Sequence, residues 1–420
     1  MPSTSMSTSP AQSDSFGHNG RFTLVAMLSV MTAAFFLHPL ALLLFTCLVA
    51  VICPTDALKW LFLAAAGTVF MILALSKQVD GDLINYVTLQ DYIAQQPLLS
   101  LLDKDQLRAL QGTYRVTEIG FYAPFWVLSL VIPDSKTAIA IGATLAIYIP
   151  TFLGLLLIGK SEKWSNGLIL TVALFTFFAG INFLQTTHLI RQYISAAFLF
   201  SGFALFLSGR KLWAAMVCIY ACSVHNGTAP LLVVLFAICW MFRFDRIGTR
   251  SLFGNFLRLL VALLLMGIAM AAIPLLQGAF AKDDVPNIKI GHYIVVGVFF
   301  LLVQSAIMMQ KLRVRTVHYA RLIFLAVFMM SLGFFFLGLA LDALRYFVYL
   351  EWLYGLMVGA MIFAWFRNSP GLRVMTRFAV SLAAAAILVG RIATSEWMYG
   401  PGDNYILNWD FLQVSKLVSR

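Results

Sequence analysis

The side chains of this 420-residue chain that could do chemistry lie in five short polar stretches between long apolar ones. They combine carboxylates, a histidine, two arginines, amides and tyrosines. Arginine binds phosphate groups through charge-assisted hydrogen bonds, and a carboxylate or an imidazole can take a proton from a hydroxyl group. The combination favours a site that holds a pyrophosphate while a hydroxyl is deprotonated. The candidates, in chain order, are Asp82, Tyr86, Glu118, Tyr122, Asn182, Arg191, Gln192, His225, Arg345 and Tyr346.

Four of the candidates also have a simpler explanation. Arg191 could reach from a helix end to the membrane surface, and Arg345 could pair with Asp342 three residues earlier. Glu118 could be a carboxylate at a helix N-terminus, and His225 an interfacial histidine with satisfied hydrogen bonds. These explanations treat the residues one at a time. We favour a shared site because the candidates come from separate segments and are expected on the same side of a membrane.

The composition decides which elements must position these residues. The chain is 61% hydrophobic and 11% charged, with a mean hydropathy of +0.88. Soluble domains are about 45–50% apolar and about 25% charged. A soluble enzyme, a disordered protein and a nucleic-acid-binding protein are therefore excluded. Because about 20 apolar residues span a bilayer, we predict an all-α, polytopic integral membrane protein with about 12–14 transmembrane helices.

The polar segments divide the chain into regions. Residues 1–20 are rich in Ser and Thr and are expected to form a disordered tail. Residues 21–394 form the membrane domain, and residues 395–420 form a polar, aromatic tail. Within the membrane domain, residues 77–117 are a long polar insertion after the third predicted span. Leucines alternate with charges in this insertion, which predicts an outer loop with short amphipathic helices.

Some spans are open to more than one interpretation. Residues 22–53 are too long for one span, and we interpret them as a hairpin broken at His38 and Pro39, or else as one long tilted helix. Residues 118–133 are marginal for a crossing and are expected to be re-entrant or to lie on the outer surface. Residues 344–366 are expected to form a single span.

The charge distribution predicts the topology. The chain has 29 Lys and Arg against 18 Asp and Glu, a formal net charge of +11. The basic residues cluster in alternate loops, which the positive-inside rule assigns to the cytoplasm. The insertion, the C-terminus and the candidate residues then face outward, and the positive charge needs no nucleic acid partner. The clustered residues are Lys160, Lys163, Arg210, Lys211, Arg243, Arg246, Arg250, Arg258, Lys311, Arg313, Arg315, Arg321, Arg367, Arg373 and Arg377.

The cysteines do not predict a metal or redox site. Cys218 and Cys222 are one helical turn apart in an apolar stretch, with no further ligand in register. We interpret them as small buried hydrophobic residues. No metal and no cofactor is expected.

The polar segments, in this order, resemble the EpsG-type family of Wzy-like bacterial exopolysaccharide and O-antigen polymerases. The similarity covers roughly residues 75–355. Asn182 and Arg191 are further apart than the family pattern usually has them. The matching segments are DGDLINYVTLQDY, similar to an Asp-x-x-x-Tyr loop; TEIGFYAPFW, similar to a Glu-Pro-Gly-Phe segment; INFLQTTHLIRQYISAAFLF, similar to an Asn and Arg-Gln helix start; SVHNGTAPLL, similar to a Phe-His element; and LRYFVYLEW, similar to an Arg-Tyr-Phe element.

The resemblance implies a reaction and its partners. The growing glycan, carried on undecaprenyl pyrophosphate, would be transferred to a sugar hydroxyl of a new lipid-linked repeat unit on the outer face of the bacterial cytoplasmic (inner) membrane. Undecaprenyl-pyrophosphate-linked oligosaccharide and membrane lipid would be the binding partners. A flippase and a chain-length regulator are further candidate partners.

The resemblance also implies roles for the candidates. Arg191 and Arg345 would hold the pyrophosphate leaving group. The base would be one of Glu118, Asp82 and His225, with Glu118 preferred. Gln192, Asn182, Tyr86, Tyr122 and Tyr346 would bind substrate. Tyr86, Tyr92 and Tyr122 would offer surfaces on which sugars stack.

Two other functions remain open from the sequence. Another lipid-carrier-dependent glycosyltransferase or a ligase would share this chemistry, and Asp80 and Asp82 fit the acidic outer loop of such enzymes. A membrane transporter would instead place its charges near the midplane, between two related halves.

Overall fold

The structure is a computed structural model that describes residues 55–77, 79, 81–99, 118–241, 290–309, 314–365 and 369–394, with isolated positions 38, 41 and 44. The side chains of residues 81–82, 240–241, 306–309, 340–342, 363–365 and 370 lie outside this description. So do the two expected tails, residues 1–20 and 395–420, nearly all of the expected hairpin at residues 22–53, and the second half of the polar insertion.

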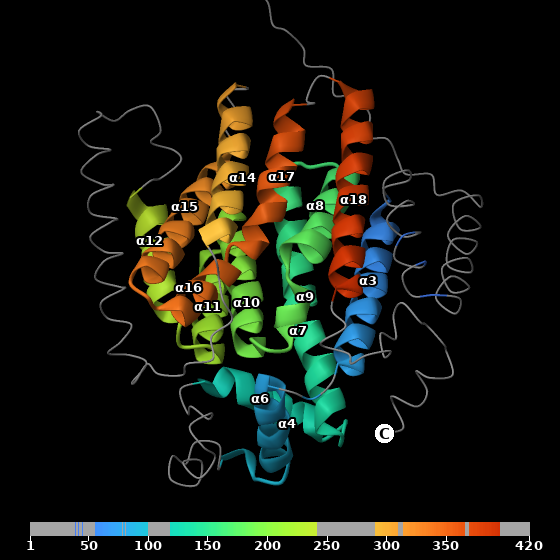
Figure 1. The fold of residues 1–420 in the computed structure, drawn as a ribbon, viewed down its shortest axis with the longest axis vertical. Coiled ribbons are helices and arrows are strands. Elements are labelled where there is room, and N and C mark those ends of the chain that lie inside the picture. The colour runs from blue at the N-terminus through green and yellow to red at the C-terminus, as the bar shows by residue number, and fades with distance from the viewer. Residues whose placement is uncertain are drawn as a thin grey trace, which may run out of the picture.

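Every regular element in the described ranges is a helix, which confirms the all-α fold class (Figure 1). Five of these helices are long and apolar enough to cross a membrane. They are α3 (Asp56–Ser76), α7 (Ser135–Ser161), α10 (Ile190–Leu207), α15 (Arg315–Phe336) and α18 (Pro370–Ala393). The others are α4 (Gly81–Ala94), α6 (Ile119–Ser129), α8 (Asn166–Phe175), the π-helix η3 (Thr176–Gly180), α9 (Phe183–Thr186), α11 (Lys211–Val224), α12 (Thr228–Met241), α14 (Ile290–Met309), α16 (Ala340–Val348) and α17 (Glu351–Trp365).

Helices α3, α7 and α8 begin where a polar side chain caps the start of an apolar run. The Asp134 side chain accepts a hydrogen bond of 2.7 Å from the Thr137 amide at the start of α7. Ser165 accepts one from the Leu168 amide at the start of α8. Such caps satisfy amide groups that the first helical turn leaves open. Within the apolar runs, the helix pairs every backbone group internally, which a bilayer requires.

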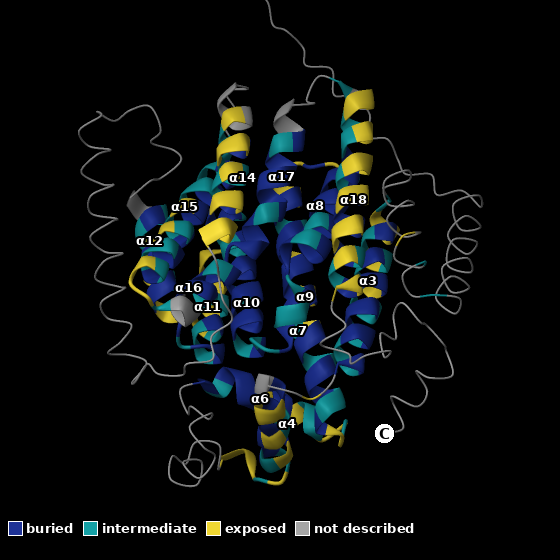
Figure 2. Ribbon diagram, in the orientation of Figure 1, coloured by how far each residue is buried: buried dark blue, intermediate teal, exposed yellow. Residues whose placement is uncertain are grey.

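Helix α10 is the centre of the bundle, and α7 and α11 pack along it (Figure 1). Small residues allow the close approach: a side chain at Gly154 would meet the Phe200 ring at 2.9 Å. The Ser201 hydroxyl donates to the Pro150 carbonyl of α7 at 2.6 Å, a hydrogen bond that joins α10 to α7. Figure 2 shows α10 buried, whereas α14 and α18 expose one side. The exposed side chains on α14 and α18 are mostly apolar, as expected for surfaces facing lipid.

Long-range hydrogen bonds define the two ends of the bundle. Lys59 donates to the Asn166 side chain at 2.9 Å, which joins the starts of α3 and α8 at one end. Lys77 donates to Thr187 at 2.8 Å, which joins the end of α3 to the segment before α10 at the opposite end. The basic residues Lys160 and Arg210 lie at the first end, because Lys160 is in the last turn of α7 and Arg210 follows α10. The positive-inside rule therefore predicts that the first end faces the cytoplasm.

Two short helices extend the opposite end. Helix α6 has 11 residues, and at about 1.5 Å per residue it is roughly half as long as the ~30 Å bilayer core is thick. In Figure 1, α4 and α6 lie beyond the lower ends of α10 and α11. The Gln90 side chain of α4 donates to the Phe125 carbonyl of α6 at 2.8 Å, and Trp126 donates to the Gln96 carbonyl at 2.9 Å. These bonds hold the two helices together as one outer layer.

The prediction of a single span at residues 344–366 is wrong. Helix α16 ends at Val348, and α17 begins at Glu351. The break is stabilised by Glu351, whose carboxylate accepts hydrogen bonds from the backbone N–H of Asn182 at 2.9 Å and from the Tyr193 hydroxyl at 3.1 Å. Both partners come from segments about 160 residues earlier, so the local hydrophobicity of residues 344–366 does not reveal the break.

Candidate active site

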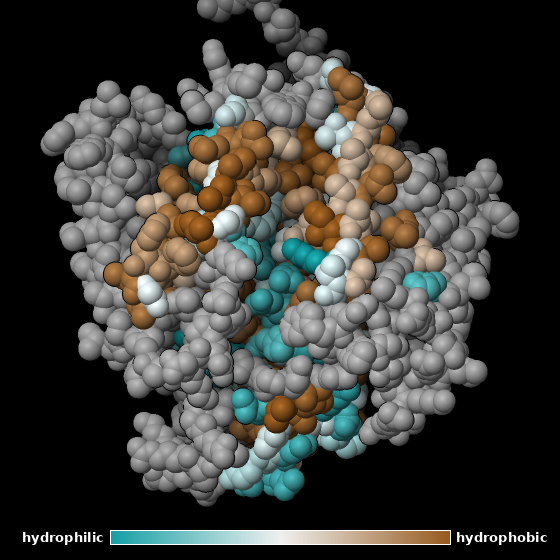
Figure 3. Space-filling view, viewed as in Figure 1, coloured by the Kyte–Doolittle hydropathy of each residue, from teal (hydrophilic) through white to brown (hydrophobic). Residues whose placement is uncertain are grey.

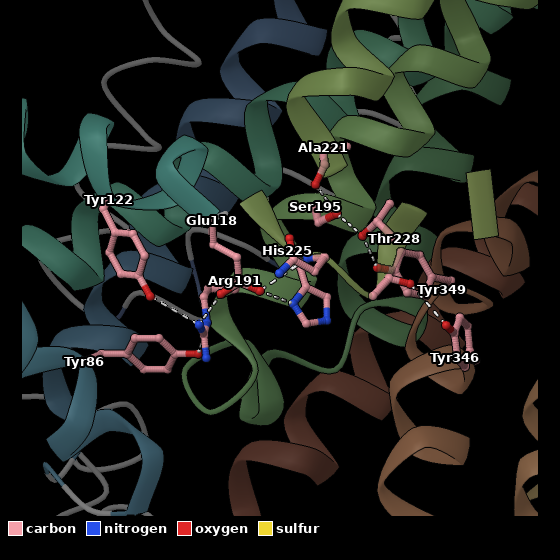
Figure 4. A network of polar contacts seen from close by, with 12 residues as sticks. Tyr86, Glu118, Tyr122, Arg191, Ser195, Ala221, His225, Thr228, Tyr346 and Tyr349 are labelled. Atoms are coloured by element: carbon pink, nitrogen blue, oxygen red, sulfur yellow. Dashed lines mark hydrogen bonds and ion pairs between the residues drawn. The ribbon is translucent and has the colours of Figure 1, made fainter. Parts of the chain in front are cut away.

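Three residues from separate segments meet at the end of the bundle that carries α4 and α6 (Figure 4). Glu118 immediately precedes α6, Arg191 lies in the first turn of α10, and His225 links α11 to α12. The Arg191 guanidinium donates from Nη1 to Glu118 Oε2. The imidazole Nδ1 of His225 lies 3.2 Å from Glu118 Oε1. The cluster thus brings together a carboxylate, a guanidinium and an imidazole, all predicted from the sequence.

Glu118 is the centre of this cluster. Its carboxylate is 1% exposed. Oε1 also accepts a hydrogen bond of 3.3 Å from the backbone N–H of Asn226. Burial raises the pKa of Glu118, but the hydrogen bond from His225 and the charge of Arg191 outweigh burial and lower the pKa to about 2. A carboxylate with so low a pKa is a weak proton acceptor near neutral pH. The preference for Glu118 as the base therefore does not fit this geometry.

His225 fits the role of a base better. Burial lowers its pKa, the bond to Glu118 opposes this, and the charges of Arg345 and Arg191 lower the pKa further, so it lies below the usual value. The imidazole is then neutral near pH 7. Since ionised Glu118 only accepts hydrogen bonds, Nδ1 of His225 carries the proton. Nε2 remains the nitrogen that can accept a proton from a substrate, and the side chain is 11% exposed.

Two tyrosines fix the Arg191 side chain. Its Nε donates to the Tyr86 hydroxyl at 3.2 Å, and Nη1 donates to the Tyr122 hydroxyl at 3.2 Å. The guanidinium carbon also lies 5.5 Å from the centre of the Tyr86 ring, a distance at which cation–π attraction contributes. The Tyr122 ring is 1% exposed, so in this structure it positions Arg191 and offers no surface for a sugar.

A second cation lies near the imidazole. Arg345 is a half-buried residue of α16, and its charge acts on His225. The Gln192 side chain donates to the Arg345 carbonyl, which ties α16 to the first turn of α10. The two arginines therefore approach His225 from different helices. This arrangement could hold an anionic group beside the imidazole.

Hydrogen bonds behind His225 hold its loop in place (Figure 4). The Tyr346 hydroxyl donates to the Gly227 carbonyl at 3.2 Å. Thr228 shares hydrogen bonds with Ser195 and, at 2.7 Å, with Tyr349. Tyr346 and Gln192, predicted to bind substrate, contact protein groups here and act as positioning residues in this structure.

Two predicted residues are not placed in this cluster. The backbone N–H of Asn182 donates to the Glu351 carboxylate, so Asn182 lies in a different polar group near the start of α17. Asp82 lies in α4, but its side chain is outside the described residues. The side chain of Asp342, the alternative partner of Arg345, is also outside them. The sequence separation between Asn182 and Arg191 was the available signal that they need not act together.

Ionisable residues that were not among the candidates also lie close to this end. Lys77 is 1% exposed, and its Nζ lies 2.8 Å from the Thr187 hydroxyl and 2.9 Å from His188 Nε2. Glu351 is also buried, and Arg391 donates to three carbonyls at the end of η3 and after it. An ionisable residue inside an apolar segment is costly, which is the signal that could have identified them.

Figure 3 shows hydrophilic side chains over the middle of one face, between the apolar surfaces of α14 and α18.

Among the described residues, no three His, Cys, Asp or Glu side chains are grouped so that they could hold a metal ion. The described part of the cluster offers two arginines, a carboxylate, an imidazole and hydroxyl groups.

The helices and this polar cluster define an all-helical, multi-pass membrane protein with buried ionisable groups near one end. The sequence matches the EpsG family over residues 59–393, which is most of the chain and includes every candidate residue. The chain belongs to the EpsG family, as its motifs predicted. Comparison with curated proteins gave no match, and comparison with solved structures gave none.

Proposed function

We propose that this protein is a polysaccharide polymerase that transfers a growing glycan from undecaprenyl pyrophosphate to a lipid-linked repeat unit. Membership of the EpsG family supports a role in exopolysaccharide polymerisation. The observation that carries the proposal is the cluster of Glu118, Arg191 and His225 at the end opposite the basic loops. The positive-inside rule assigns that end to the outer face, where flipped lipid-linked repeat units arrive. The proposed location is the bacterial inner membrane.

The two arginines would bind the donor. Cleavage of the bond between the anomeric carbon and the pyrophosphate oxygen leaves an extra negative charge on the leaving group. Arg191 and Arg345 would stabilise that charge as it grows in the transition state. Arg191 is suited to this because Tyr86 and Tyr122 hold its guanidinium in one orientation before substrate binds.

The imidazole would activate the acceptor. The acceptor hydroxyl oxygen forms a bond to the anomeric carbon while its proton passes to Nε2 of His225. The electron pair of the broken bond leaves with undecaprenyl pyrophosphate. Glu118 would stabilise the imidazolium that forms, because its carboxylate accepts the hydrogen bond from Nδ1. The protonated His225 then returns its proton to solvent.

The test uses a strain that lacks the gene and carries variants of it. His225→Ala should leave lipid-linked glycan of one repeat unit, with in-vitro turnover reduced about 10²–10⁴-fold while protein level stays normal. His292→Ala, at an exposed histidine of α14, is the matched control and should restore full-length polymer. Full-length polymer from His225→Ala would overturn the assignment.

The same strain separates the alternatives. A ligase defect would leave long, lipid-linked polymer that is not passed on, whereas a polymerase defect leaves single repeat units. A transporter would move its substrate in proteoliposomes without changing glycan length. Co-purification with a flippase or a chain-length regulator would support the proposed partners.

A further inference from the structure

An apolar groove lies beside the polar cluster, between α6, α7, α10 and α11. It encloses about 230 Å³. Nearly all its lining is apolar, with the Tyr220 side chain at one side. The lining residues are Gly120, Phe121, Pro124, Phe125, Val127, Leu128, Val131, Gly142, Leu145, Ala146, Ile194 and Tyr220.

The packing of small residues shapes this groove. A side chain at Gly142 would meet the Phe125 ring at 2.7 Å and Leu128 at 2.9 Å, so glycine lets α6 lie directly against α7. On the other side, the Tyr220 hydroxyl donates to the Gly120 carbonyl at 3.0 Å and joins α11 to the start of α6. The first turn of α6 therefore forms the inner wall of the groove.

The outer side of the groove is continuous with surfaces suited to lipid. Leu145 lines the groove and is itself exposed, at the start of an apolar stripe on α7. Val131, at the outer end, is 78% exposed. Apolar stripes at helical spacing flank the groove on both sides. They consist of Leu145, Ile149 and Leu153 on α7, and of Leu212, Met216 and Ile219 on α11.

The inner side of the groove adjoins the candidate active site. Gly120 is two residues after Glu118, and Ile194 is one helical turn after Arg191 on α10. Phe121, in the lining, also contacts Tyr86 with ring centres 5.7 Å apart. A molecule with an anionic head at Arg191 and an apolar chain could therefore occupy both places at once.

We propose that this groove binds the isoprenoid chain of the lipid-pyrophosphate substrate, next to the pyrophosphate that the arginines hold. The proposal rests on the proposed function for the identity of the head group. Two features select this occupant: positive charge at the inner end, which complements a pyrophosphate, and an apolar path from there to the lipid-facing stripes. An apolar cavity of about 150 Å³ holds a benzene ring. A groove of about 230 Å³ is thus suited to the first one or two isoprene units.

An isoprenoid chain in the groove gains specific contacts with the protein but little hydrophobic driving force. Bilayer tails are already apolar, so binding there depends on close van der Waals packing. Filling the groove should therefore weaken binding of the prenyl chain, even with an apolar side chain. Ala146→Phe fills the groove from α7. Ala215→Phe is the matched control, because Ala215 is an exposed residue of α11 outside the groove.

The first experiment measures binding without turnover. The full-length protein in nanodiscs is labelled with a polyprenyl pyrophosphate that carries a diazirine near its head group. We expect adducts in residues 119–131 and 142–146, competed by unlabelled undecaprenyl pyrophosphate. Labelling should fall about tenfold in Ala146→Phe and stay at the wild-type level in Ala215→Phe. Equal labelling of these residues by a diazirine phosphatidylglycerol would mean an ordinary lipid contact and would overturn the proposal.

A second variant covers the case in which Ala146→Phe does not fold. Val131→Asp places a charge at the exposed mouth of the groove and should reduce labelling by a similar factor. Unchanged labelling in a folded groove variant would also overturn the proposal.

The second experiment separates this proposal from the proposed function. Glycan donors with long and with short prenyl chains are compared, and the ratio of their kcat/KM values should fall about tenfold in Ala146→Phe. If wild-type protein forms no polymer from either donor while labelling is specific, the polymerase function fails and the prenyl groove stands. If polymer forms and the ratio of the two kcat/KM values is unchanged in Ala146→Phe, the groove does not bind the prenyl chain, and the polymerase function stands.

Discussion

The imidazole Nδ1 of His225 lies 3.2 Å from Oε1 of Glu118, although 107 positions separate the two residues in the chain. The same carboxylate binds the Arg191 guanidinium through its other oxygen. One buried acid therefore orients both the group that can accept a proton and the group that can hold a phosphate.

The first prediction concerns pH. Because the pKa of His225 lies below its usual value, kcat/KM should stay constant near pH 7 and fall as the pH drops through that pKa. Glu118→Gln removes the carboxylate that raises the pKa of His225, so the acidic limb should move to lower pH and the plateau should fall. A pH–rate profile of in-vitro polymerisation measures both. An acidic limb near pH 2 in the wild type, absent from Glu118→Gln, would instead identify Glu118 as the base.

The second prediction concerns the identity of the cation at position 191. Lysine keeps the charge but has one nitrogen in place of the planar guanidinium, whose Nε donates to Tyr86 while Nη1 donates to Glu118 and Tyr122. Arg191→Lys should therefore reduce kcat by about 100-fold or more. Arg210→Lys, at an exposed arginine at the opposite end of α10, should change it less than twofold. Near-normal kcat in Arg191→Lys would show that charge alone is sufficient.

The third prediction separates the two contacts between Tyr86 and Arg191. Tyr86→Phe removes a hydrogen bond worth about 0.5–1.5 kcal/mol but keeps the ring beneath the guanidinium. Tyr86→Ala removes both contacts. We expect kcat/KM to fall up to about tenfold in the first variant and further in the second. Equal losses would assign the whole effect to the hydroxyl.

The fourth prediction concerns the buried Lys77. Its amino group contacts Thr187 and His188, the segment that leads into Arg191. Lys77→Met leaves those groups without this partner and should destabilise the protein by roughly 1–3 kcal/mol. The loss should be visible as a lower Tm in detergent, together with a lower kcat. Lys211→Met, at an exposed lysine of α11, is the control and should leave both unchanged. A lower kcat at unchanged Tm would place Lys77 nearer to the substrate than the structure does.

Much of the fold follows from the sequence because a bilayer permits few solutions. Apolar runs must become helices so that their backbone groups are paired, and the basic loops then set the orientation. Helices α3, α7, α10 and α11 begin and end close to the limits of their apolar runs for this reason. The break between α16 and α17 was missed because its cause, Glu351, acts through Asn182 and Tyr193 from distant segments.

For the candidate site, the residue types of Glu118, Arg191 and His225 and their place at one end of the bundle could be predicted from motifs and charge. Which group is the base could not, because the pKa of a carboxylate or imidazole depends on neighbours that only folding supplies. Tertiary structure placed Arg191 and His225 on opposite oxygens of Glu118, which lowers the pKa of that acid and favours His225 as the base. It also formed the apolar groove beside them, since helices α6, α7, α10 and α11 each contribute only part of its wall.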